Sequence, residues 1–138
     1  MAVEIDVVYQ GELRCQATHG PSGVQVVTDA PVDNHGKGES FSPTDLVATA
    51  LGGCILTILG IVSERHGLAL AGTTIKVEKH MVADPVRRIG ALPVVVNMSC
   101  VVEEKHKTLF ENAAATCPVH QSLHPEIEKP ITFVWKQA

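Results

Sequence analysis

The sequence predicts an α+β fold with the element order βββ-α-ββ-α-β, and three observations lead to it. Short alternating runs separated by Gly and Pro fill the first third of the chain. A long uncharged apolar segment with the start signals of a helix follows. The remainder holds Val-rich runs, a second helical pattern and a short closing run. A length of 138 residues fits one domain, residues 1–138.

The first third predicts three antiparallel strands joined as a meander. Residues 3–9, 13–18 and 24–28 are strand-like, and Gly-containing or Pro-containing turns separate them. Residues 29–42 then form a loop that is long for a compact domain. Loops of this length more often carry function or contact a partner than serve as plain connections.

The central segment predicts a long helix with clear ends. Ser42 is a good N-cap, Pro43 suits the first helical position, and Asp45 completes a box-like cap. We expect the helix to run to about His66, with Gly67 as its stop. Residues 46–63 are uncharged and just reach the roughly 18 residues of a membrane span. Because they contain several Gly, Thr and Ser and lack Lys or Arg anchors, we expect a buried core helix.

The second half alternates strands and helices. A strand is expected at residues 73–82, a turn at Asp84-Pro85 and a Val-rich strand at residues 94–102. A helix at residues 105–116 is broken by Cys117-Pro118, and residues 119–123 suit a further helical turn. The closing strand is expected at residues 131–135.

Composition excludes several classes of protein. The net charge is −4 and Arg87-Arg88 is the largest basic cluster, so we expect no nucleic-acid partner. The first residues lack the charged and apolar regions of a secretory signal, and no membrane association is expected. Four cysteines are too few for a disulfide scaffold, which favours a reducing, cytoplasmic location.

Cys54, deep in the apolar helix, is either an inert core residue or a protected reagent. An apolar site by itself disfavours a thiolate, so reactivity requires a nearby cation. Arg14 is the most economical candidate because a guanidinium stays charged in a dry pocket. Glu39 or Asp45 could orient it. The alternative is that Cys54 only fills the core and Arg14 faces water.

Cys117 ends a helix before a proline, where a side chain can point into a cleft. If the fold brings it to Cys54, the two suit a peroxidatic and a resolving thiol. Cys15 and Cys100 lie on predicted strands, where packing is the expected role. Cys117, His120 and His124 were weighed as a metal site, but two prolines interrupt that stretch and no CxxC pair supports it. We expect neither a metal nor a cofactor.

Several motifs together resemble the OsmC/Ohr family, named for osmotically inducible protein C and organic hydroperoxide resistance protein. The resemblance covers nearly the whole chain and indicates a divergent OsmC-like branch. The motifs are Thr28-Asp29-Ala30-Pro31, Ser42-Pro43-Thr44-Asp45-Leu46, Ala50-Leu51-Gly52-Gly53-Cys54, Arg87-Arg88-Ile89 and Cys117-Pro118-Val119-His120-Gln121-Ser122-Leu123.

The resemblance implies an intertwined homodimer whose active sites lie at the subunit interface. It implies the reduction of organic hydroperoxides with a dithiol or a lipoylated protein as the reductant. Cys54 matches the family's peroxidatic position, Cys117 the resolving one and Arg14 approximately the activating arginine. The hydroperoxidases carry a Glu directly after the proline of the helix start, and here that position is Thr44.

These observations together predict a cytoplasmic, thiol-dependent peroxidase that reduces alkyl or lipid hydroperoxides. Its expected catalytic residues are Cys54, Cys117, Arg14 and Glu39. The alternative is a non-catalytic or weakly active, stress-associated ligand-binding dimer on the same scaffold. Thr44 in place of the family's Glu is the feature that favours the alternative.

Overall fold

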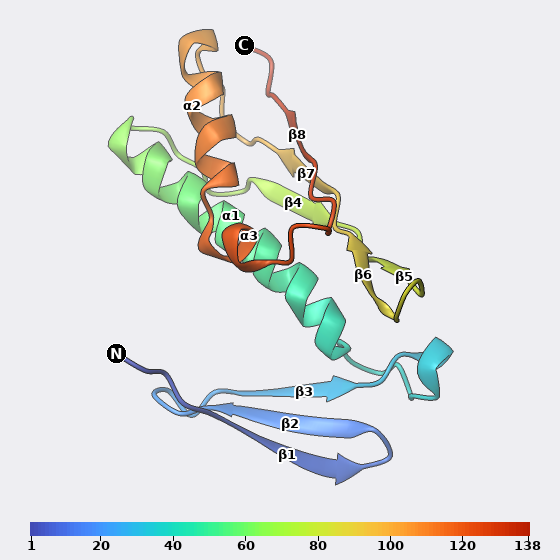
Figure 1. Cartoon of the computed structure of the whole chain (residues 1–138). Helices are drawn as coiled ribbons and strands as arrows, with labels where there is room; N and C mark the ends of the chain where they lie inside the picture. Colours follow the sequence, from blue (N-terminus) through green and yellow to red (C-terminus); the bar gives the residue numbers. More distant parts are fainter. The chain divides into compact units, whose positions relative to one another are not determined.

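The computed structural model describes all 138 residues, and its elements are labelled in Figure 1. The chain divides into two compact units, residues 1–47 and 48–138, and each is described by itself. The fold is α+β, as the sequence predicts. A single domain over residues 1–138 stays a prediction.

The first unit contains the predicted three-stranded meander. Its strands are β1 (Ile5–Gly11), β2 (Arg14–His19) and β3 (Gln25–Asp29), which pair antiparallel in the order β1-β2-β3. Because side chains alternate along a strand, one face of this sheet is mostly apolar and the other mostly polar. The apolar face holds Ile5, Val7, Tyr9, Cys15, Ala17 and Val26. A single 3₁₀ turn, η1 (Val32–Asn34), lies in the long loop that follows.

Helix α1 (Pro43–Arg65) begins and ends almost where its capping signals predict. The Ser42 Oγ accepts the backbone N–H of Asp45 at 3.0 Å, and the Asp45 carboxylate accepts the N–H of Ser42 at 2.9 Å. This reciprocal pair is a capping box. At the other end Gly67 has φ +64° and the N–H of Leu68 donates to the Ser63 carbonyl, which is the left-handed stop that glycine allows.

One stripe of α1 is buried. Its buried residues recur every three or four positions and are Ala48, Leu51, Gly52, Ile55, Leu59, Val62 and Ser63. By length and composition alone α1 could cross a membrane, because an 18-residue window of it has a mean hydropathy of 2.2. In the folded chain, 39% of that window is buried. A side chain at Gly52 would begin 3.1 Å from Val77 and 3.2 Å from Ile75. The helix therefore packs closely on the strand that carries those two residues, as a core helix does.

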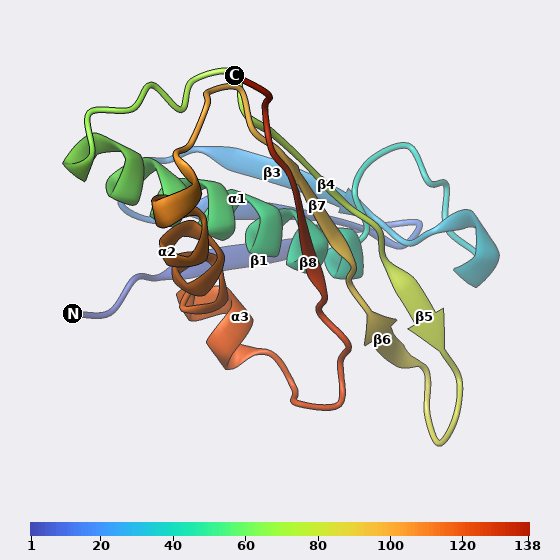
Figure 2. The same ribbon diagram turned by 90° about the horizontal axis from the view of Figure 1, so that it is seen from above.

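That strand, β4 (Thr74–Val77), belongs to the main sheet of the second unit, together with β7 (Val94–Asn97) and β8 (Ile131–Val134). The order is β4-β7-β8, antiparallel between β4 and β7 and parallel between β7 and β8. The register gathers apolar residues on one face, which are Ile75, Val77, Val94, Val96, Ile131 and Phe133. Figures 1 and 2 show α1 and α2 alongside this sheet. The core of the second unit lies between them.

Four strands, not two, separate α1 from the next helix. The run expected as one strand at 73–82 divides into β4 and β5 (His80–Val82), because the chain leaves the main sheet at Glu78 and Lys79. β5 then pairs with β6 (Arg88–Ala91) in a separate hairpin, and β6 was not anticipated. The strand expected at 94–102 ends at Asn97. Just beyond it, the Ser99 hydroxyl donates to the carbonyls of Leu70 and Ala71, and the backbone leaves the sheet.

The C-terminal helices agree with the sequence. Helix α2 (Glu104–Ala115) is followed by a short helix, α3 (Pro118–Ser122), which begins at the expected proline. Phe110 of α2 is fully buried and its ring lies edge-on to Trp135, with 6.5 Å between centroids. Trp135 in turn stacks on Phe133 of β8. These rings attach α2 to the sheet.

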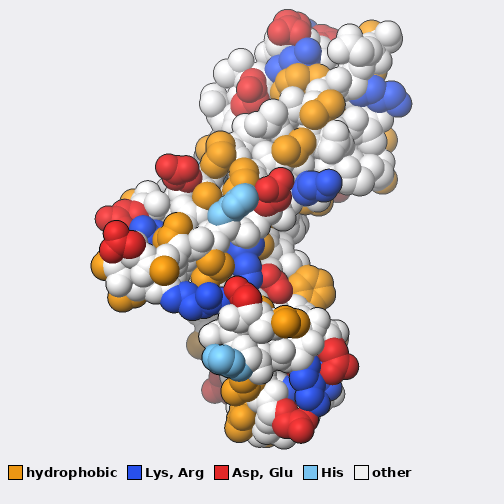
Figure 3. Space-filling view, turned by 90° about the vertical axis from the view of Figure 1, so that its right-hand side faces the viewer, with side chains coloured by type: hydrophobic (Ala, Val, Ile, Leu, Met, Phe, Trp, Pro, Cys, Tyr) orange, Lys and Arg blue, Asp and Glu red, His pale blue; other side chains and the backbone are white.

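Charges of both signs lie close together on the surface. In the view of Figure 3, acidic and basic side chains lie next to one another in small groups, and apolar side chains lie between these groups. Ion pairs such as Arg88–Glu126 and Lys107–Glu104 reflect the same mixing.

Truncation of Phe110 tests the α2 contact. Phe110→Ala removes a fully buried ring and leaves a cavity beside Trp135, so we expect the free energy of unfolding to fall by about 3–5 kcal/mol. Urea denaturation followed by fluorescence of Trp135, the only tryptophan, measures it. Leu109→Ala is the matched control, because Leu109 is 41% exposed and should cost much less. Equal losses for the two variants would contradict this account of the core.

Candidate active site

Cys54 lies about three turns into α1, at the edge of the buried stripe, and is half-buried. Its neighbour Gly53 contributes no side chain, and a Cβ at Gly53 would have no atom within 4 Å other than those of its own stretch of helix. One helical turn to either side lie Ala50 and Ile58. The thiol therefore has apolar neighbours along the helix and open space beside it.

Cys117 is the N-cap residue of α3 and its side chain is fully buried. Its sulfur accepts the backbone N–H of His120 at 3.4 Å. Burial lowers the pKa of the His120 imidazole below its usual value, and the Lys129 ammonium adds to that effect. At neutral pH His120 is consequently uncharged, so it supplies the thiol with a backbone dipole and no cation.

The two thiols meet within the second unit, and both are free. Burial raises the pKa of the Cys117 thiol above its ordinary value, and a hydrogen bond with Cys54 raises it further. The backbone N–H of His120 acts in the opposite direction but does not outweigh them. Cys117 therefore stays protonated and can donate to the Cys54 sulfur. Residues that are far apart in the sequence thus form a thiol pair in the fold.

The residues weighed as a metal site do not form one cluster. Cys117 Sγ accepts the N–H of His120, and Nδ1 of His124 accepts the N–H of Glu126 at 3.1 Å. The chain has no group of three or more His, Cys, Asp or Glu side chains placed to hold a metal ion.

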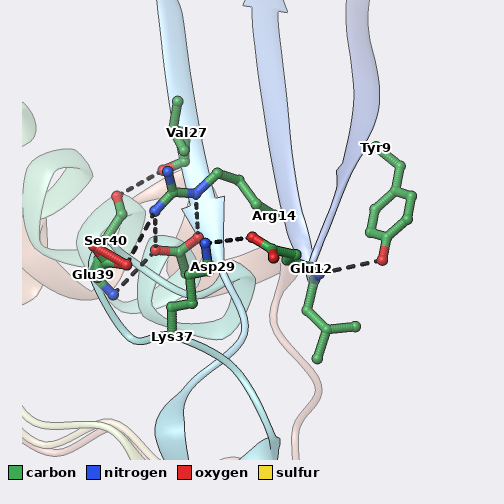
Figure 4. A network of polar contacts seen from close by, with 9 residues as sticks. Tyr9, Glu12, Arg14, Val27, Asp29, Lys37, Glu39 and Ser40 are labelled. Atoms are coloured by element: carbon green, nitrogen blue, oxygen red, sulfur yellow. Dashed lines mark hydrogen bonds and ion pairs between the residues drawn. The ribbon is translucent and has the colours of Figure 1, made fainter.

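Arg14 belongs to the first unit, where it is the centre of the polar network shown in Figure 4. Its Nε lies 2.7 Å from Asp29 Oδ1 and its Nη2 lies 2.9 Å from Asp29 Oδ2, which is a bidentate pair. The two residues are direct partners across β2 and β3, so the strand register sets this contact. The Asp29 side chain is only 1% exposed, against 33% for Arg14. Hydrogen bonding to Arg14 holds the pKa of Asp29 below its usual value although burial opposes this.

Of the two acids expected to orient Arg14, Glu39 lies beside it, and Asp45 takes part in the cap of α1. Glu39 Oε1 is 3.9 Å from Arg14 Nη2, and the Glu39 side chain is 64% exposed. The Asp45 carboxylate instead accepts the N–H of Ser42 in the helix cap. Asp29, the main partner, was missed because the sequence places it in a loop rather than at the end of β3. Counting residue pairs outward from the turn at Pro21 and Ser22 would have found it.

Further contacts hold the turn that precedes Arg14. Glu12 and Leu13 have φ of +53° and +62°, values that are uncommon for residues other than glycine. The N–H of Leu13 donates to the Tyr9 hydroxyl, and the Leu13 carbonyl accepts the N–H of Ala30. Lys37 forms an ion pair with Glu12. The long loop is thereby attached to both strands of the hairpin.

Part of the same loop borders an open depression of about 390 Å³, lined by Gly38, Glu39, Ser40, Phe41 and Asp45. Ser40 Oγ donates to the Val27 carbonyl at 2.8 Å, which holds the loop against β3. Glu39 belongs both to this depression and to the surroundings of Arg14. Of the two acids beside Arg14, Glu39 is exposed to solvent and Asp29 is buried.

The fold is α+β, and it brings a thiol of the long central helix α1 to a thiol at the start of the short helix α3. These features define the class as a two-thiol protein of the kind that the sequence motifs resemble. The family model described as OsmC-like protein matches residues 36–130. This match covers most of the chain, and a solved structure described below is 45% identical over 94% of it. The chain belongs to the OsmC-like protein family.

Three solved structures illustrate the similarity. A Psychrobacter arcticus 273-4 protein, named as a candidate osmotic stress induced and detoxification response protein, is 45% identical, with 94% of each chain covered and a TM-score of 0.90. An OsmC-like protein from Mycoplasma pneumoniae is 13% identical, with 99% of each chain covered and a TM-score of 0.82. An organic hydroperoxide resistance protein from Elizabethkingia anophelis is 16% identical, covers 99% of this chain and 97% of its own, and has a TM-score of 0.79.

The two distant structures share the fold of this chain. A search of curated proteins returned no match.

Thiol alkylation tests the environment of Cys117. We expect iodoacetamide to modify Cys117 more slowly than half-buried Cys100 in the folded protein, because burial and the hydrogen bond with Cys54 raise the pKa of Cys117. In Cys54→Ala the hydrogen bond is lost, so the alkylation of Cys117 should begin at lower pH. Peptide mass spectrometry across a pH series measures both residues. An unchanged pH profile in the variant would mean that the two thiols do not interact.

Proposed function

We propose that the protein is a thiol-dependent peroxidase that reduces organic hydroperoxides through a peroxidatic Cys54 and a resolving Cys117. The observation that carries this proposal is the contact between two free thiols of unequal burial. Two structural cysteines would need no such contact, whereas a peroxidase that forms a disulfide needs it. Membership of a family that includes hydroperoxide resistance proteins supports the same function.

In the first step the Cys54 thiolate attacks the terminal oxygen of the hydroperoxide. A sulfur–oxygen bond forms while the oxygen–oxygen bond breaks, which yields a sulfenic acid on Cys54 and an alcohol after the alkoxide takes up a proton. Sulfur is oxidised and the peroxide is reduced. We propose that Arg14 stabilises the thiolate and the departing alkoxide, since a guanidinium keeps its charge in an apolar site. Its acidic neighbours, Glu39 among them, would adjust its position.

In the second step the Cys117 thiol attacks the sulfenic sulfur of Cys54. A disulfide forms and the sulfenic oxygen leaves as water with the thiol's proton. A dithiol reductant, such as a lipoylated protein, then exchanges with the disulfide and restores both thiols while it becomes oxidised itself. The protonated state of Cys117 suits this order, because it is Cys54 that must be the thiolate at the start.

The surroundings of Cys54 support alkyl or lipid hydroperoxides as substrates. Ala50 and Ile58 flank the thiol along α1, and the position of Gly53 leaves open space beside it. Burial of one methylene stabilises a bound ligand by about 0.8 kcal/mol. A substrate chain of a few carbons would therefore be strongly favoured over hydrogen peroxide.

We further propose a cytoplasmic homodimer in which the active sites lie at the subunit interface. The apolar face of the β1-β2-β3 sheet supports this, since Ile5 and Val7 are each 61% exposed and Tyr9 is 62% exposed. Apolar surface of this kind is usually covered by a partner. Four free cysteines favour a reducing compartment.

The second candidate function is a weakly active, ligand-binding dimer on the same scaffold. Thr44 favours it, because the hydroperoxidases have a Glu at this position and the Thr44 hydroxyl here lies 3.1 Å from Ser42 Oγ in the helix cap. Turnover with a hydroperoxide distinguishes the two candidates.

Replacement of the peroxidatic sulfur is the direct test of turnover. With an organic hydroperoxide and a dithiol reductant, we expect Cys54→Ser to lower peroxide consumption roughly 1,000-fold, since the nucleophile is lost. Cys100→Ser is the matched control and should retain the wild-type rate. Equal rates for wild type and Cys54→Ser would rule out the peroxidase and favour the ligand-binding dimer.

The disulfide is a second, independent test. One equivalent of organic hydroperoxide without reductant should produce a Cys54–Cys117 disulfide, because the resolving thiol already contacts Cys54. In Cys117→Ser the sulfenic acid should persist and be trapped by dimedone. Intact and peptide mass spectrometry detect both products. A disulfide that instead joins Cys15 or Cys100 would assign the resolving role to another residue.

A further inference from the structure

Two histidines that the thiol chemistry does not use lie together in the second unit. His66 directly follows the last residue of α1, and His106 lies in the first turn of α2. Their ring centroids are 4.7 Å apart, and the angle between the ring planes is 63°. His66 is exposed and His106 is half-buried, so ions in solution can reach the pair.

A hydrogen bond of His66 fixes which of its ring nitrogens is free. Nδ1 of His66 lies 3.0 Å from the Val62 carbonyl oxygen. Because a carbonyl oxygen only accepts, Nδ1 carries the proton and the lone pair of the neutral ring is on Nε2. Histidines that bind metals in proteins are commonly oriented in this way, by a hydrogen bond from the other ring nitrogen to a carbonyl or carboxylate. His66 is therefore prepared to act as a ligand through Nε2.

The separation of the two rings also suits a shared metal ion. A metal–nitrogen bond is about 2.1 Å long, so the centroid of a bound imidazole lies roughly 3.2 Å from the metal. Two imidazoles at the angles of tetragonal or tetrahedral coordination therefore have centroids roughly 4.5–5.2 Å apart. The distance of 4.7 Å between His66 and His106 falls within this range. Because aromatic rings in edge-on contact have a similar separation, it is the free Nε2 of His66 that indicates a ligand.

The ends of the two helices favour a cation at this place. The last carbonyls of α1 give its C-terminal end a partial negative charge, which stabilises a nearby cation. The start of α2 has the opposite partial charge, but it carries Glu103 at the N-cap and Glu104 in the first turn. Lys105 and Lys107 pair with these two carboxylates at 3.4 Å and 2.9 Å, which balances the charge at this end of α2.

We propose that His66 and His106 together bind one divalent transition-metal ion of the class of Ni²⁺, Cu²⁺ and Zn²⁺, with water completing its coordination. Neutral imidazole is a ligand that these ions favour. The chain supplies two ligands at this site, which agrees with the absence of any group of three or more ligating side chains. The bound ion would join the end of α1 to the start of α2.

This site is separate from the thiol pair. His66 lies roughly 18 Å along α1 from Cys54, at a rise of about 1.5 Å per residue. The inference therefore goes beyond the proposed peroxidase function and does not rest on it.

Calorimetric titration with Ni²⁺ tests the site, in reduced protein freed of reductant and of any affinity tag. We expect wild type to bind one Ni²⁺ per chain. Binding should be about tenfold weaker or more in His66→Gln and in His106→Gln, since each variant removes one of two ligands. His80→Gln is the matched control, because His80 is an imidazole of the same unit that is 56% exposed. Its affinity should equal that of wild type.

Urea denaturation with and without Ni²⁺ gives a second readout, because an ion that binds only the folded chain raises its stability. The unfolding midpoint should rise with Ni²⁺ concentration in wild type and in His80→Gln, and it should stay constant in His66→Gln. If one of the two ligand variants does not fold, the other decides.

Three results would overturn the proposal. The first is an unchanged Ni²⁺ affinity in His66→Gln and His106→Gln. The second is an equal loss in His80→Gln, which would mean unspecific binding by surface imidazoles. The third is nickel–thiolate charge-transfer absorption, which would place the ion on Cys54 or Cys117. A wild type that binds Ni²⁺ through the histidine pair but reduces no hydroperoxide would retain this site and reject the peroxidase.

Discussion

The packing of α1 on the β4-β7-β8 sheet is the interaction on which the thiol pair depends. Because Gly52 has no side chain, the helix lies so close to Ile75 and Val77 that a Cβ at this position would be 3.1–3.2 Å from them, which is tighter than an ordinary contact. Because Cys54 follows two residues later, this approach fixes both the depth and the rotation of the thiol. Cys117 reaches it only because Phe110 attaches α2 to the same sheet, and the next residues after α2 carry the second sulfur inward.

Cys54 and Cys117 carry the same chemical group, but they differ in burial because their surroundings differ. Cys117 is enclosed at the start of a short helix, where burial and the neighbouring thiol keep its proton in place. Cys54 is half-buried on a helix whose adjacent glycine leaves room for a ligand. This unequal exposure supports the proposed division of roles, in which the accessible Cys54 would meet the substrate and the enclosed Cys117 would react with oxidised Cys54.

Helix caps and turn residues were enough to predict most helices and strands from the sequence. Which strands pair with each other, and in which register, could not be predicted in the same way. The cap at Ser42 and Asp45, the stop at Gly67 and the break at Pro118 follow from side-chain chemistry within a few residues. The division of residues 73–82 between two sheets does not, because apolar alternation is the same whichever strand lies alongside. Likewise the sequence indicated that Arg14 needs an acid, but Glu39 and Asp45 were favoured for their closeness to the helix start. Asp29 is selected by the register of β2 and β3, which local patterns do not reveal.

The carboxylate partner of Arg14 comes from the sheet and not from the start of α1. A Glu at position 44 would lie in the first turn of α1, outside the strand pair that holds Arg14. Asp29 has a shorter side chain on the strand directly paired with Arg14, and the ladder of hydrogen bonds between β2 and β3 sets the distance. With the arginine's partner supplied by the sheet, Thr44 and Asp45 are left to the helix cap. Arg14 therefore has a buried acidic partner although position 44 carries a threonine.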